Sequence, residues 1–111
     1  MSEKVRVHPP KPATTWQMLA GFRRVHIFVK GRVQGVFFRQ SAKKKAKKIG
    51  VFGWIKNLAD GRVEAVIEGE TKKVEEMIEW LKKGPIIANV EALEIKQEKY
   101  QGEFKNFDLR F

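Results

Sequence analysis

The chain has 111 residues, no cysteine and a formal net charge of +10, from 23 basic and 13 acidic side chains. This is the length of one ordinary domain, which can bury roughly two-thirds of the surface that its unfolded chain exposes. The lack of cysteine excludes a disulfide framework, thiolate catalysis and cysteine-ligated metal sites, while the positive charge favours an anionic partner such as a phosphate-bearing substrate, a nucleic acid or a lipid surface.

The first twenty residues differ in composition from the remainder of the chain. Residues 1–20 hold three of the four prolines and show no hydrophobic period, so we predict a disordered tail. The open alternative is a docked arm, in which Trp16, Met18 and Leu19 cover apolar surface. This segment lacks the apolar core of a secretory signal, and no apolar run in the chain approaches the roughly 20 residues that cross a membrane. We therefore expect a soluble, cytoplasmic protein with no membrane partner.

A strand, a loop and a helix are predicted from Arg24 onward. Hydrophobic residues at every second position from Val25 to Val29 predict a half-buried strand, which is followed by a loop over GRVQG with a glycine at each end. A helix comes next, because its apolar residues share one stripe and Gly50 suits its C-terminal cap. The members of this stripe are Phe38, Ala42, Ala46 and Ile49. Five lysines between residues 43 and 48 lie mainly on the other faces.

The remaining elements complete a recognisable order. Two strands, VFGWIKNL and GRVEAVIEG, are joined through an Asp-Gly pair, which is a strong hairpin signal. A second helix is predicted from Thr71 to Lys83, ended by Gly84-Pro85. A further strand covers Asn89 to about Lys99, and alternation in FKNFDLRF predicts a last strand. The order β-α-β-β-α-β with an added C-terminal strand predicts an α+β, ferredoxin-like sandwich, with both helices packed on one face of an antiparallel sheet.

This topology brings two distant segments to one edge of the sheet. The first and second strands run parallel with the third between them, so the loop Gly31–Phe38 and the strand end at Asn57 meet there. Gly31 and Gly35 permit the backbone angles and close approach of a tight turn, and the loop leads into a helix N-terminus that favours negative charge. Successive backbone N–H groups can form a concave nest for an anion. These groups belong to Gln34, Gly35, Val36, Phe37 and Phe38.

Two side chains at the same edge suit an anion. Arg39, in the first helical turn, can bind two phosphate oxygens with its guanidinium. Asn57 can hold a water or a carbonyl oxygen. Each feature also has an ordinary interpretation, as a turn, a solvated arginine and a turn-forming asparagine. Their convergence favours a small phosphate cradle, with the lysines forming a solvated helix face.

Three segments of the chain resemble the acylphosphatase family. They are GRVQGVFFR at residues 31–39, GWIKNLADGRVEAVIEG at residues 53–69 and WLKKGP near residue 80. Residues 24–111 match in order and length, so residues 21–111 are expected to form an acylphosphatase-like domain. The resemblance implies a metal-free, cofactor-free hydrolase that cleaves the carboxyl–phosphate anhydride of acyl phosphates. It implies that Arg39 binds the substrate phosphate, that Asn57 positions the attacking water, and that the amides of Gln34 to Phe38 form the phosphate cradle.

Further expectations and one departure accompany the resemblance. We expect inorganic phosphate as product and competitive inhibitor, no specific nucleic acid, and a monomer. Leu58 stands where many relatives have a threonine, which removes a hydroxyl that could support Asn57. The motif supplies no cysteine, paired carboxylates or serine–histidine pair for a covalent intermediate, and His26 in the first strand is expected to be a structural or solvated residue and not a base. Orientation and charge stabilisation are then the expected means of catalysis.

Two alternative functions are compatible with the fold. RNA-recognition domains share it and stack bases on aromatics of the first and third strands, but the third strand here presents Glu64, Val66 and Glu68 on its outer face. The other alternative is a non-catalytic acylphosphatase-like domain, against which the intact Arg39 and Asn57 argue.

Overall fold

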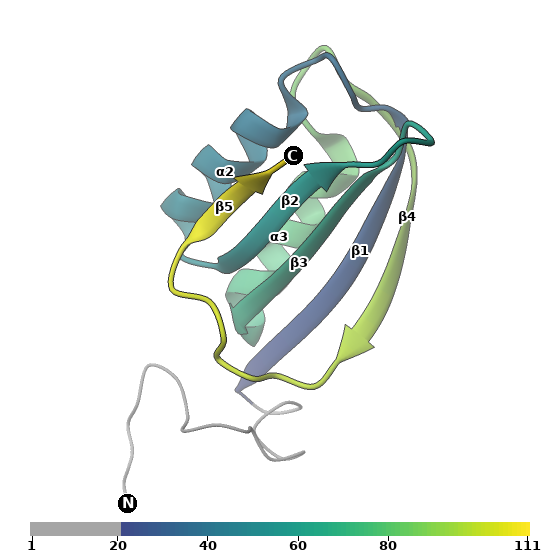
Figure 1. Cartoon of the computed structure of the whole chain (residues 1–111). Helices are drawn as coiled ribbons and strands as arrows, with labels where there is room; N and C mark the ends of the chain where they lie inside the picture. Colours follow the sequence, from purple (N-terminus) through teal and green to yellow (C-terminus); the bar gives the residue numbers. More distant parts are fainter. Residues whose placement is uncertain (1–20) are drawn as a thin grey trace, which may run out of the picture.

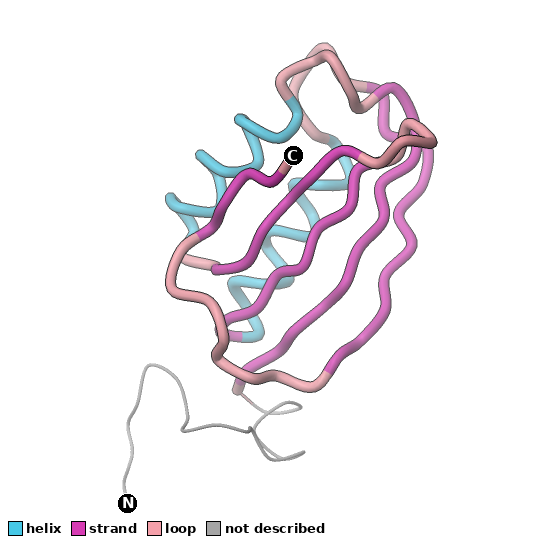
Figure 2. The backbone as a smooth tube through the Cα atoms, in the orientation of Figure 1, coloured by secondary structure: helices cyan, strands magenta, loops and turns pink. Residues whose placement is uncertain are grey.

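The predicted order of helices and strands is confirmed by a computed structural model, which describes residues 21–111 (Figures 1 and 2). Five strands form one sheet, and two helices cover one of its faces. The elements are β1 (Phe22–Arg32), α2 (Phe38–Ile49), β2 (Phe52–Asn57), β3 (Val63–Glu70), α3 (Thr71–Lys83), β4 (Asn89–Glu98) and β5 (Phe107–Arg110). The expectation for residues 1–20, a disordered tail or a docked arm, lies outside the described residues. No helix within residues 21–111 is long and apolar enough to cross a membrane.

The sheet has the strand order β4-β1-β3-β2-β5, so β3 lies between β1 and β2. Ala65 of β3 faces Ile27 of β1 on one side and Ile55 of β2 on the other, and both pairings are antiparallel. Since both neighbours run opposite to β3, they run parallel to each other. The C-terminal ends of β1 and β2 therefore lie at the same end of the sheet (Figure 1).

The direction of the last strand differs from the prediction. The expectation of a wholly antiparallel sheet was wrong for β5, which pairs in parallel with β2, with Leu109 opposite Ile55. The reason lies in the connection from β4, which crosses the lower end of the sheet in Figure 1 to the opposite edge. A strand that begins where β4 stops must run opposite to β4, and this is the direction of β2. The sheet is therefore mixed.

The core lies between the sheet and the two helices. Alternation in β1 places Val25, Ile27 and Val29 on the helix side, where all three are buried. Helical spacing gives each helix one buried stripe against this layer. The stripes consist of Phe38, Ala42 and Ala46 in α2, and of Val74, Met77, Ile78 and Leu81 in α3.

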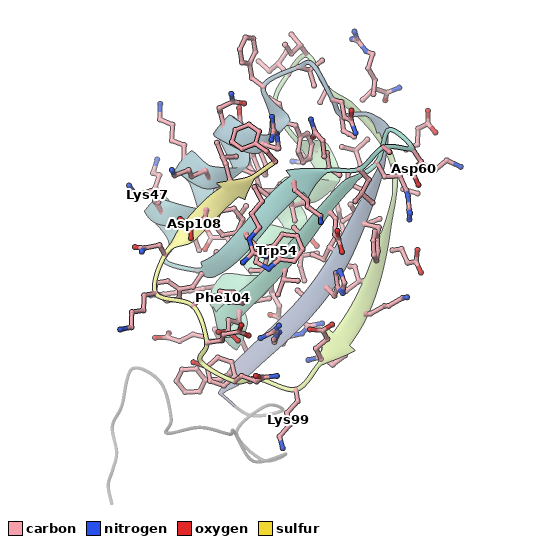
Figure 3. All side chains as sticks on the ribbon, viewed as in Figure 1. Lys47, Trp54, Asp60, Lys99, Phe104 and Asp108 are labelled. Atoms are coloured by element: carbon pink, nitrogen blue, oxygen red, sulfur yellow. The ribbon has the colours of Figure 1, made fainter. Side chains whose placement is uncertain are left out.

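The connection from β4 to β5 is fixed by a buried carboxylate. Glu68 of β3 is 1% exposed and accepts hydrogen bonds from the backbone N–H groups of Glu103 and of Phe104, the latter at 3.0 Å. The guanidinium of Arg24 lies 3.7 Å away. Burial and the Glu68 charge raise the pKa of Tyr100 to about 12, so this buried phenol stays neutral. Figure 3 shows Phe104 at this lower end of the sheet.

Replacing Glu68 with alanine is expected to lower the free energy of unfolding by about 3 kcal/mol, because it leaves the N–H groups of Glu103 and Phe104 without this acceptor and Arg24 without this carboxylate. Urea denaturation measures the change. The matched control is Glu91→Ala, an exposed residue of β4, for which a change within about 0.5 kcal/mol is expected. Equal effects of the two substitutions would contradict the role given to Glu68.

Candidate functional site

A shallow cavity of about 190 Å³ opens at the end of the sheet where β1 and β2 stop. Its lining comes from the β1–α2 loop, the first turn of α2 and the last residue of β2. The lining residues are Val33, Gly35, Phe37, Phe38, Arg39, Gln40 and Asn57. Of these seven, within residues 21–111, Arg39 alone carries a charge. The loop, Arg39 and Asn57 therefore share one cavity whose only formal charge is positive.

The loop backbone has the geometry of an anion nest. Gly35 and Phe37 both have left-handed backbone angles, with φ of 74° and 62°. Left-handed residues in a turn bring successive N–H groups onto one concave side, where they can bind an anion. Among the backbone hydrogen bonds of residues 21–111, none is donated by the N–H groups of residues 34–38. These donors are available to a ligand.

The N-terminus of α2 adds to the positive potential of the cavity. Phe37 occupies the N-cap position, and its side chain makes no capping hydrogen bond. The first turn contains no acidic residue. A helix end with free N–H groups and no nearby carboxylate has an uncompensated dipole, which attracts an anion.

Arg39 is held at the cavity by the end of β5. Its Nη1 donates to the carbonyl oxygen of Arg110 at 2.9 Å, and its guanidinium carbon lies 4.8 Å from the centre of the Phe111 ring. A guanidinium has five N–H donors in a fixed plane, so one such bond orients the group and leaves other donors for an anion. These two contacts join residues about seventy positions apart, and sequence reasoning missed them.

Asn57 ends β2 opposite Val63. Its side-chain carbonyl oxygen, Oδ1, is buried and has no hydrogen-bond partner in the part of the chain that the structure describes. A buried acceptor without a donor costs about 1–3 kcal/mol. Asn57 as a residue lines the cavity, so rotation of its amide group can turn this oxygen towards a water or a ligand there.

Two residues of the predicted cradle do not line the cavity. Gln34 turns its side chain towards the β2–β3 turn, where Nε2 donates to the carbonyl oxygens of Leu58 at 2.7 Å and Arg62 at 2.9 Å. Val36 is buried in the core. Leu58 has no hydroxyl group, unlike the threonine that many relatives have at this position. Its backbone carbonyl nevertheless anchors the β1–α2 loop by accepting a hydrogen bond from Gln34.

Gly31 has a different role from the one predicted. It lies within β1, opposite Val90 of β4, where the pairing register shifts. A Cβ atom at this position would lie 2.1 Å from the carbonyl oxygen of Asn89. Gly31 therefore permits the close approach of β4. Gly35 has open space around it, and a glycine suits this position because its backbone is left-handed.

Within residues 21–111, no group of three or more histidine, cysteine, aspartate or glutamate side chains is arranged to hold a metal ion. His26 lies on the open face of the sheet, away from the cavity lining. Its Nε2 is 2.6 Å from Glu64 and its Nδ1 is 3.2 Å from Glu98. These contacts agree with the structural role expected for His26.

Comparisons with known proteins agree on one family. The sequence profile of the acylphosphatase family matches residues 25–109. An acylphosphatase of Pyrobaculum calidifontis is 58% identical over 87 residues, which are 78% of this chain and 79% of that protein. An acylphosphatase of Rubrobacter xylanophilus is 49% identical over 88 residues, 79% of this chain and 80% of the relative. The solved structure of an acylphosphatase from Coxiella burnetii has a TM-score of 0.77 and 37% identity, covering 83% of this chain and 96% of that one.

The Gln34 tether generates a prediction about the loop. Replacing Gln34 with alanine removes two hydrogen bonds and is expected to lower the free energy of unfolding by about 1–2 kcal/mol, measured by urea denaturation. Gln101→Ala, at an exposed position, is the matched control and is expected to have little effect. If both variants unfold at the same urea concentration, the tether does not stabilise the loop.

Proposed function

The chain belongs to the acylphosphatase family, and we propose that Arg39, Asn57 and the backbone N–H groups of residues 34–38, of which Gly35, Phe37 and Phe38 line the cavity, form its active site. The enzyme hydrolyses the mixed anhydride of acyl phosphates to a carboxylate and inorganic phosphate. The observation that carries this assignment of the site is that one cavity brings together an arginine, an uncapped helix N-terminus and Asn57, whose buried carbonyl oxygen has no donor among residues 21–111.

The phosphate group of the substrate binds in the nest of loop N–H groups. The positive end of α2 and the Arg39 guanidinium stabilise its negative charge. Because Arg39 is already oriented by the Arg110 carbonyl, little reorganisation is needed when the substrate binds. The same donors stabilise the charge on the phosphoryl oxygens in the transition state, where preorganised donors are most effective.

Asn57 orients the attacking water. Its Oδ1 accepts a hydrogen bond from the water, which directs a lone pair of the water oxygen to phosphorus. The new P–O bond forms as the bond from phosphorus to the acyl oxygen breaks, and the electron pair of that bond leaves with the carboxylate. An in-line arrangement of this kind relies on positioning and charge stabilisation.

The proton of the water passes to a phosphate oxygen of the substrate. His26 is hydrogen-bonded to carboxylates on the open sheet face, and none of the cavity-lining residues within 21–111 is a carboxylate or a histidine. The leaving carboxylate is a weak base, so no protein acid is needed to protonate it. The inorganic phosphate that forms occupies the same nest and competes with substrate.

The open face of the sheet argues against RNA binding as an alternative function. Two rings on this face, those of Phe28 and Trp54, already lie under cationic side chains of the same chain. Arg62 lies 4.8 Å from the centre of the Phe28 ring, and Arg110 lies 4.6 Å from the Trp54 ring. A base would have to displace these contacts before it could stack. The non-catalytic alternative is disfavoured because Arg39 and Asn57 share one cavity. Our proposal includes a monomer that acts in the cytoplasm without a specific nucleic acid.

Arg39→Ala is expected to lower turnover of acetyl phosphate by about 10²–10³-fold, the effect of removing one preorganised donor, and to weaken competitive inhibition by inorganic phosphate. Steady-state kinetics in the presence of a chelator measure both effects. Lys43→Ala is the matched control, because it removes one positive charge from the next turn of α2 outside the cavity lining. Near-normal kinetics of Arg39→Ala would refute the assigned role.

Asn57→Ala is expected to separate chemistry from binding. Turnover should fall by about 10²-fold or more, while the inhibition constant of inorganic phosphate stays within a few-fold of wild type, because the loop amides and Arg39 remain. Circular dichroism should show a native spectrum, since the substitution empties no apolar core. If phosphate affinity falls in step with turnover and the spectrum stays native, Asn57 binds phosphate and does not orient water.

A further inference from the structure

Phe37 has a backbone conformation that is unfavourable for its side chain. Among residues 21–111 it is the only non-glycine residue with a positive φ, at 62° with ψ of 26°. In this left-handed region the Cβ atom of an L-residue crowds the backbone, whereas glycine adopts it without strain. The ring is also 67% exposed, so it contributes little apolar burial to folding. A glycine would fit this position better on both counts.

The neighbours of Phe37 hold the ring outside the core. Val36 and Phe38 are both buried, which fixes the chain on either side and turns the intervening side chain outward. Strained residues of this kind persist where the surrounding structure determines them, and they cluster at ligand sites. Phe37 lines the cavity with Arg39 and Asn57, so the exposed ring stands at the rim of the phosphate site.

The size of the cavity determines which part of a substrate meets this ring. Its volume of about 190 Å³ is below the roughly 300 Å³ of the smallest pockets that bury most of a drug-sized ligand. The phosphate and the carbonyl group can enter, but a larger acyl group must pass over the rim. The rim there offers aromatic surface, because the exposed Phe111 ring also lies at this site, against Arg39.

We propose that the Phe37 ring binds the acyl group of the substrate and that this enzyme prefers acyl phosphates with a planar, apolar acyl group. This inference rests on the proposed function, because it needs phosphate in the adjacent nest. Two aromatic rings in offset or edge contact gain stability beyond their burial of apolar area. A small acyl group such as acetyl is too short to cover the ring and gains none of this contact.

The test is the ratio of kcat/KM for benzoyl phosphate to kcat/KM for acetyl phosphate. Any effect of a substitution on the nest acts on both substrates and cancels in the ratio. In Phe37→Ala and Phe37→Gly the ratio is expected to fall about fivefold to tenfold, equivalent to about 1.0–1.4 kcal/mol. Phe37→Leu should retain part of the preference, because it keeps an apolar side chain. Ile86→Ala is the matched control, since Ile86 is another exposed hydrophobic residue but lies outside the cavity lining, and the ratio should not change in this variant.

A second measurement separates the ring from the backbone. Phe37→Gly should melt at a higher temperature than Phe37→Ala, because glycine relieves the left-handed strain that alanine keeps. The ratio of the two kcat/KM values should nevertheless fall equally in both variants, since both lack the ring. Loss in Phe37→Ala but not in Phe37→Gly would overturn the proposal and assign the preference to the backbone.

Two other outcomes would also overturn it. An unchanged ratio in all three variants, with wild-type enzyme active on acetyl phosphate, would show that the ring does not contact the acyl group; the proposed function would then stand alone. A wild-type enzyme inactive on both substrates would remove the proposed function and this inference together.

Discussion

The pairing of β3 with both β1 and β2 is the constraint on which the site depends. Because β3 is antiparallel to each neighbour, β1 and β2 must end on the same side of the sheet. Asn57 is thereby brought next to a loop more than twenty residues earlier in the chain, without any direct contact between β1 and β2. Side-chain hydrogen bonds from Gln34 to the β2–β3 turn then fix the loop against the strand end that carries Asn57.

The site consists mainly of backbone groups that the fold leaves without hydrogen-bond partners within residues 21–111. Few side chains belong to it. The loop amides and the uncapped end of α2 lack partners within residues 21–111, and Asn57 Oδ1 is a buried acceptor without a donor. In the proposed site, an anion would bind the free N–H groups and a water would donate to Asn57 Oδ1. The opposite end of the sheet behaves differently, because Glu68 satisfies the loop amides there with a protein carboxylate. The N–H groups of Glu103 and Phe104 thus have an acceptor within the chain, whereas those of the β1–α2 loop have none within residues 21–111.

Local patterns were sufficient for most of the fold. The helix from Thr71 to Lys83 was predicted to the residue, since its apolar spacing and its glycine-proline end depend only on neighbours in sequence. The meeting of Arg39 and Asn57 followed from topology. The direction of β5, the contact of Arg39 with Arg110 and the burial of Glu68 could not be predicted, because each depends on the path of the β4–β5 connection. That path depends on tertiary contacts across the lower end of the sheet and has no periodic sequence pattern.

The basic residues of α2 fall into two groups, which act on an anion over different distances. The helix carries six basic residues and no acidic one. Only Arg39 lines the cavity, while Lys43 and Lys47 line a separate groove beside β5 together with Lys105 and Asp108; Figure 3 shows Lys47 and Asp108 on that side. Successive turns of a helix are about 5.4 Å apart. The backbone of Lys43 is therefore separated from that of Arg39 by less than the Debye length, which is about 8 Å at physiological salt. The lysines attract anions to this side of the molecule in a salt-dependent way, whereas in the proposed site the Arg39 guanidinium, oriented by the Arg110 carbonyl, would bind one phosphate at close range. Net charge alone therefore could not distinguish a polyanion surface from a phosphate site; the placement of a single arginine at the loop could.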